Sequence, residues 1–70
     1  MTLEELKEKY RALAGTCEKQ GNEYQNQAQE AKLKGQSENA SRYFDKATTE
    51  YLKAAMFTYF ITDLYHLEIK

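Results

Sequence analysis

The chain has 70 residues, with no proline, three glycines and one cysteine, and its 11 acidic and 10 basic residues leave a formal net charge of −1. This length allows one domain at most, and a single core of this size supplies little stability unless the fold is stapled or oligomeric. One cysteine excludes an internal disulfide, and one cysteine with one histidine falls short of a structural zinc site. The balanced charge argues against a basic field that holds nucleic acid.

The sequence also argues against a signal peptide and a membrane span. Residues 1–10 are charged and lack the apolar centre of a secretory signal. The apolar stretch 52–67 is shorter than the roughly 20 residues that span a bilayer, and it contains Lys53, Asp63 and His66. A soluble cytoplasmic protein without membrane contact is therefore the expectation.

A first helix is predicted from about residue 3 to residue 34. Thr2 and Glu5 form a capping box, in which each side chain bonds the backbone N–H of the other residue. Charged residues of the first turns, among them Lys7, are expected on a solvated face. The apolar residues recur at helical spacing, which predicts one inward stripe. This stripe comprises Leu3, Leu6, Tyr10, Leu13, Ala14, Cys17, Tyr24, Ala28 and Ala31.

Gly21-Asn22 leaves two interpretations of this segment open. A helical glycine costs about 1 kcal/mol relative to alanine, and Gly-Asn is a plausible turn. A break at Gly21 would give a three-helix bundle. The apolar stripe, however, keeps its phase across Gly21, which favours one continuous helix.

The chain is predicted to reverse at residues 35–36. Lys34-Gly35 is typical of a helix end, and Ser37 is expected to cap a second helix over about 37–67. Two helices of nearly equal length with a short link favour an antiparallel hairpin. This register places Gly21 beside Tyr51, where glycine leaves room for the ring. The inward positions of the second helix are Ala40, Tyr43, Phe44, Ala47, Tyr51 and Ala54.

The second helix becomes apolar all round after Leu52. A single partner helix cannot cover such a surface, and an exposed apolar patch of this kind marks an interface. The sequence therefore predicts an all-α fold, a long antiparallel hairpin that pairs with a second copy as a dimeric four-helix bundle. The predicted interface consists of Leu52, Met56, Phe57, Tyr59, Phe60, Leu64 and Leu67.

The residues that carry chemistry are few. Cys17 lies on the inward stripe and is expected to be buried. Asp63 and His66, three residues apart, are interpreted as a surface pair, because two groups do not make a metal site. The sequence predicts no catalytic set, no metal, no cofactor and no small-molecule substrate, and hence no enzyme.

Residues 28–54 resemble part of a tetratricopeptide or related MIT-type helical hairpin. The resemblance rests on the small and aromatic positions of the repeat, and it implies a peptide-binding scaffold. The chain lacks a second unit at the 34-residue period and a closing proline, and its second helix is longer than the repeat's. These departures argue against assigning the chain to this family. The matching residues are Ala28, Ala31, Gly35, Ala40, Phe44 and Ala47.

The expected function is protein–protein interaction by a small helical adaptor, regulator or inhibitor. Its partner is a second copy, another protein, or both. One alternative is nucleic-acid binding by a dimeric bundle, although the basic residues are interleaved with acids. A small phage or mobile-element protein that blocks a host factor would show the same pattern.

Overall fold

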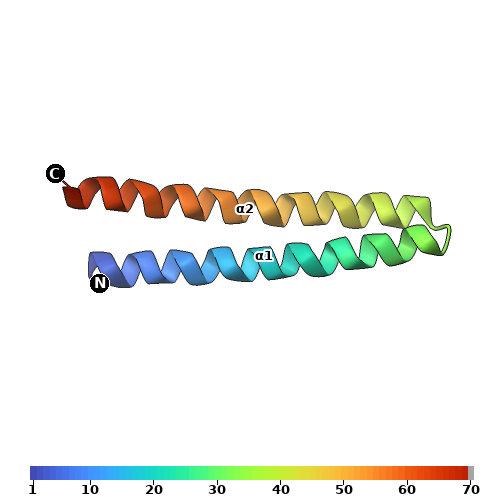
Figure 1. Cartoon of the computed structure of the whole chain (residues 1–70), viewed down its shortest axis with the longest axis horizontal. Coiled ribbons are helices and arrows are strands. Elements are labelled where there is room, and N and C mark those ends of the chain that lie inside the picture. The colour runs from blue at the N-terminus through green and yellow to red at the C-terminus, as the bar shows by residue number, and fades with distance from the viewer. Residues whose placement is uncertain (70) are drawn as a thin grey trace.

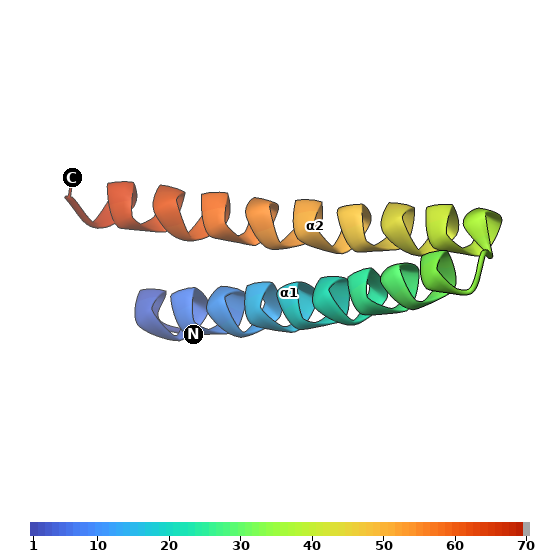
Figure 2. The same cartoon turned by 45° about the vertical axis from the view of Figure 1, so that its right-hand side comes forward.

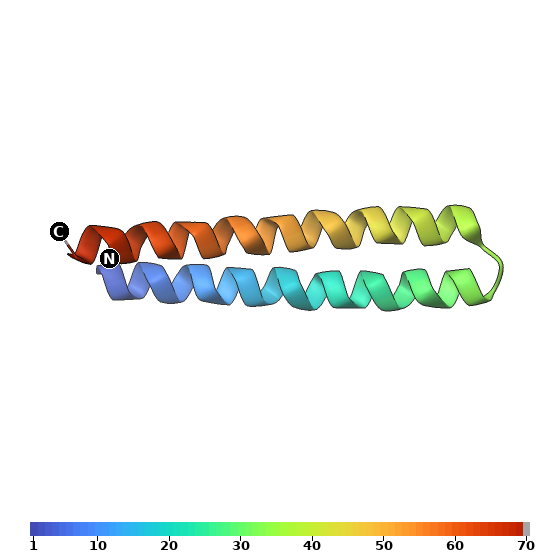
Figure 3. The ribbon, with the colours of Figure 1, turned by 45° about the horizontal axis from the view of Figure 1, so that its top comes forward.

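The computed structural model describes residues 1–69, with side chains for residues 1–67. Two helices, α1 (Leu3–Leu33) and α2 (Ser37–Ile69), pack antiparallel along their whole length (Figure 1). Both termini lie at one end and the turn lies at the other, in Figure 1 and in the tilted view of Figure 3. The all-α helical hairpin predicted from the sequence is confirmed, and α2 extends two residues beyond its expected end.

Helix α1 begins and continues as its local sequence dictates. The Thr2 hydroxyl accepts a hydrogen bond from the backbone N–H of Glu5 at 3.1 Å, which satisfies one of the unpaired N–H groups of the first turn. The helix runs unbroken through Gly21, so the three-helix alternative is wrong. Buried contacts along the helix outweigh the propensity cost of glycine there.

The turn closes α1 through a glycine in the left-handed region. Gly35 has a φ of 74°, which costs glycine little because it has no Cβ. The N–H of Gly35 bonds the carbonyl of Lys32 at 3.1 Å, and that of Gln36 bonds Ala31 at 2.9 Å, the pattern of a Schellman motif. Gln36, rather than the predicted Ser37, holds the cap position of α2, since its carbonyl accepts from the N–H of Ala40.

The buried seam between the helices consists almost entirely of small residues. Apart from Ala31, which lies three residues after Ala28, alanine or glycine recurs at every seventh position, a heptad spacing that keeps one edge of each helix against the other. Side chains of this size let the two backbones approach closely. Within residues 1–67 no large apolar side chain is fully buried. The buried small residues are Ala14, Gly21, Ala28 and Ala31 on α1, and Ala40, Ala47 and Ala54 on α2.

Lys7 occupies the same heptad row, one repeat before Ala14, and only 1% of it is exposed. The expectation of a solvated Lys7 is therefore wrong. Its Nζ lies 2.6 Å from Glu4 Oε1 and 4.0 Å from the centroid of the Tyr65 ring. A buried ammonium group is tolerated because both neighbours stabilise its charge.

The hairpin is extended, 54 × 15 × 13 Å, with a radius of gyration of 15.9 Å. A compact domain of this length would have a radius near 11 Å. Its surface of 5376 Å² exceeds the roughly 4500 Å² of an average monomer of 8.2 kDa. No helix within the described residues is long and apolar enough to cross a membrane.

Candidate interaction surface

One side of the hairpin carries stacked aromatic rings from both helices, and we call it the aromatic face. Near the open end, the Tyr10 ring of α1 packs against Phe57 and Phe60 of α2, with centroids 5.9 and 5.6 Å apart. Nearer the turn, Tyr24 stacks on Tyr43 at 6.4 Å. These contacts bridge the helices on one side of the alanine seam and so define one face of the hairpin. Figure 2 shows the two helices that carry this face lying side by side.

The predicted interface residues divide into two groups. Phe57 and Leu64 are half-buried in the hairpin, and Phe57 finds a stacking partner in Tyr10, so a single hairpin accounts for these two better than the sequence indicated. The others remain between 41% and 69% exposed, which is unusual for large apolar side chains that cluster. They are Leu52, Met56, Tyr59, Phe60 and Leu67.

Helix α1 contributes to the same surface, which the sequence analysis missed. Leu13, predicted to point inward, is 37% exposed, while Leu3, Leu6 and Tyr10 are only half-buried. The reason is the alanine seam, because only the row at Ala14 and its heptad equivalents points directly at α2. The heptad spacing of small residues is the sequence signal that separates this buried row from its flanks.

The opposite side of the hairpin, called the polar side below, carries most of the hydrogen bonds between the helices. Arg11 Nη2 donates to the hydroxyl of Tyr65, and the Tyr51 hydroxyl donates toward Asn22 Oδ1 at 2.5 Å and Gln25 Oε1 at 3.0 Å. The threonines of α2 bond their own helix, as Thr62 does to the carbonyl of Thr58 at 3.1 Å. This side also has apolar surface, since Tyr59, which is 69% exposed, lines a hollow there with Tyr51 and Ala55. Phe44, predicted inward, is 37% exposed on this side.

Cys17 lies half-buried near Glu50 on the aromatic face. Partial burial raises the pKa of its thiol, and the hydrogen bond and charge of Glu50 raise the pKa further, while Lys53 lowers it. Lys53 Nζ lies 3.2 Å from Glu50 Oε1. A thiol with a raised pKa is mostly protonated at neutral pH and is a poor nucleophile.

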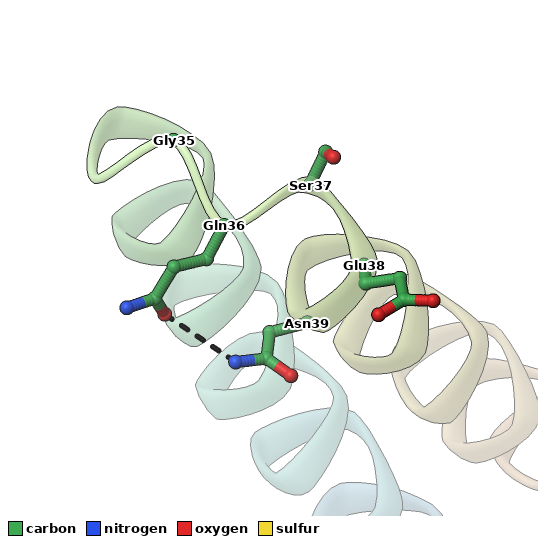
Figure 4. A pocket seen from close by; sticks show the side chains of 5 residues that line it. All are labelled: Gly35, Gln36, Ser37, Glu38 and Asn39. Carbon is green, nitrogen blue, oxygen red and sulfur yellow. Dashed lines mark hydrogen bonds between the residues drawn. The ribbon is translucent and has the colours of Figure 1, made fainter.

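The turn carries a shallow polar hollow, lined by residues 35–39. Figure 4 shows the Asn39 amide directed at Gln36, whose Oε1 accepts from Asn39 Nδ2 at 3.4 Å. The described residues hold no group of three or more potential metal ligands of the His, Cys, Asp and Glu types. His66 is exposed near the end of α2. The aromatic face is therefore the surface on which a function can be argued.

Comparisons with models of protein families, with curated proteins and with solved structures find no match to this chain. The function is therefore inferred from the physical character of the aromatic face.

Proposed function

We propose that this protein is a non-catalytic protein–protein interaction module that self-associates through the open half of the aromatic face. In the bound form two hairpins make a four-helix bundle. The contact surface combines Met56, Phe60 and Leu67 of α2 with Leu13 of α1.

One observation supports this function above the others: large apolar side chains lie outside the core while alanines fill it. Burying one such side chain is worth roughly 1.5–3 kcal/mol, and the hairpin leaves several of them in water together. Methionine and aromatic residues are also the types that interface cores enrich. A symmetric dimer covers the same patch on both copies, so each burial counts twice.

The substitution Phe60→Asp tests the proposal. It places a charge in the centre of the patch, and two copies of Phe60 contribute about 3–6 kcal/mol of burial to a dimer. Since about 1.4 kcal/mol corresponds to tenfold in affinity, we expect dimer affinity to fall at least about 100-fold. Light scattering over a concentration series measures the change as a shift from dimer mass to monomer mass.

Thr62→Asp is the matched control, because Thr62 is exposed on the polar side of α2, two residues beyond Phe60. We expect this variant to keep the wild-type mass at every concentration. If wild type is monomeric at millimolar concentration and Phe60→Asp unfolds it, Phe60 acts within the monomer and the proposal is wrong.

Nucleic-acid binding is a second candidate, on the strength of one cluster near the turn. Lys46 Nζ lies 5.7 Å from the ring centroids of both Tyr24 and Tyr43, and aromatic rings with a cation are what single strands stack on. Fluorescence anisotropy with a labelled single-stranded oligonucleotide tests it. Affinity that falls steeply with salt, and is lost in Lys46→Gln, would support this function.

A further inference from the structure

We propose that the second copy packs on the aromatic face with the two-fold axis along the length of the hairpin. In this arrangement α1 of each copy lies against α2 of the other, and both turns lie at the same end of the bundle. The inference rests on the proposed self-association and adds its orientation and its pairs of residues.

Large apolar side chains on the aromatic face form one row on each helix. On α1, Leu6 and Leu13 are spaced by seven and flank the half-buried row of Tyr10. On α2, Phe60 and Leu67 are spaced by seven and flank the row of Phe57. At about 100° per residue these four side chains point away from the hairpin on this face, toward any helix stacked on it.

The next row outward on each helix is mostly polar. It contains Lys9, Thr16, Glu23 and Glu30 on α1, and Arg42, Thr49, Met56 and Asp63 on α2, each exposed. Because the row is one step beyond the apolar flank, it forms the rim of an interface on the aromatic face. Charges at a rim govern orientation and register more than affinity.

Contacts between the helices show which residues lie at similar levels along the hairpin. Tyr10 contacts Phe57 and Phe60, Tyr24 contacts Tyr43, and the Tyr51 ring reaches Gly21, so the numbers of neighbouring residues add up to between 67 and 72. The numbers of Lys9 and Asp63, and those of Glu30 and Arg42, both add up to 72. Each pair therefore lies within about one and a half helical turns of one level, which the long lysine and arginine side chains can bridge.

A two-fold axis along the hairpin preserves these levels between copies. Lys9 then faces Asp63 of the second copy at one end, and Glu30 faces Arg42 of the second copy near the other. Between the rims, Leu13 of one copy meets Phe60 of the second. Every charged pair at the rim joins opposite signs, and the axis repeats each pair twice.

A two-fold axis across the hairpin at the level of Phe60, the centre of the apolar patch, does not reproduce this match. It stacks α2 on α2, sets Phe60 near its own copy and brings Asp63 against Met56. In that arrangement the half of each hairpin nearest its turn, which contains Glu30 and Arg42, extends beyond the other copy. These residues then form no rim of the interface. The axis along the hairpin does bring two copies of Glu50 toward the bundle centre, each accompanied by its own Lys53 at 3.2 Å.

Single-cysteine variants test the orientation. In a Cys17→Ala background, Lys9→Cys and Asp63→Cys are prepared separately, mixed, and treated with a short bis-maleimide. We expect a covalent heterodimer in the mixture, and at least tenfold less covalent dimer from either variant alone, since like positions lie on opposite sides of the bundle. Mass spectrometry of the product identifies the two linked chains.

The control mixture replaces Asp63→Cys by Thr62→Cys, whose position points to the polar side, and should give no covalent heterodimer. Efficient cross-linking of Asp63→Cys with itself, or none in a mixture that light scattering shows to be dimeric, overturns the orientation and leaves self-association standing. A mixture that stays monomeric at millimolar concentration overturns both.

Discussion

Gly21 is the residue whose small size the close packing of the two helices most directly requires. A Cβ built at Gly21 would lie 2.8 Å from Cε1 of Tyr51 and 3.0 Å from Cδ1 and Cζ. The ring cannot swing aside freely, because its hydroxyl is held by Asn22 and Gln25 on α1. Glycine is therefore required here by the space between the helices.

We expect Gly21→Ala to destabilise the hairpin, despite the gain of about 1 kcal/mol in helix propensity. Chemical denaturation followed by circular dichroism measures the change. Gly15→Ala is the control, because nothing lies within 4 Å of its Cβ position, and it should stabilise by about 1 kcal/mol. In a Tyr51→Ala background Gly21→Ala should become stabilising as well. Stabilisation by Gly21→Ala in the wild-type background would contradict the close contact.

Cys17 allows a second prediction at the residue scale. Glu50 disfavours the thiolate by its charge and by accepting a hydrogen bond, so Glu50→Gln should lower the pKa of Cys17. The rate of alkylation by iodoacetamide, measured against pH, should then rise at lower pH than in wild type. Glu18→Gln, an exposed change one residue along, should leave the profile in place. An unchanged profile in Glu50→Gln would remove Glu50 from the cause.

At the scale of elements, the open end of the hairpin depends on Tyr65. Lys7 Nζ lies 4.0 Å from the centroid of the Tyr65 ring, and the Tyr65 hydroxyl accepts a hydrogen bond from Arg11. One side chain of α2 therefore contacts two successive turns of α1. A cation over an aromatic ring in a desolvated site contributes up to about 2 kcal/mol. The first turns of α1 are therefore secured by polar contacts where the alanine seam ends.

We expect Tyr65→Leu to lower stability by about 1–2 kcal/mol and to speed amide hydrogen exchange in the first three turns of α1. Tyr59→Leu is the control, since Tyr59 is 69% exposed on α2 and belongs to no ring pair among the described side chains of residues 1–67. Equal exchange in the two variants would show that the open end does not depend on Tyr65.

The sequence predicted these elements well and their inner packing only in part. Helical spacing, the Thr2 cap and Gly35 are local signals, and each one lies where it was predicted. The continuity of α1 followed from the phase of the apolar stripe. The exposure of Leu13 was not predictable from hydrophobicity, because the row that faces α2 consists mainly of small residues. The burial of Lys7 was not predictable either, because it depends on contacts of Nζ with Glu4 and with the Tyr65 ring of α2. Similarly, the pairing of Tyr10 with Phe57 and Phe60 depends on the register of the whole hairpin.

At the scale of the whole molecule, the hairpin has too much surface for its mass. Its alanine seam buries little area per residue, while the side chains that bury most area, such as Phe60 and Leu67, remain outside. Two long helices have only one contact line between them, and a second layer of helices is the simplest way to cover the aromatic face. This requirement connects the shape of the molecule with the proposed self-association.

The proposed self-association predicts that the stability of this protein depends on its concentration. When folding and dimer formation are coupled, each tenfold increase in concentration stabilises the dimer by about 1.4 kcal/mol, so the unfolding temperature rises. We expect a clear upward shift of Tm over a hundredfold range of concentration in wild type, followed by circular dichroism. Phe60→Asp should unfold at a lower Tm that is the same at every concentration, and Thr62→Asp should follow wild type. A wild-type Tm that does not change over this range would mean that the single hairpin is stable alone, with its apolar side chains in water.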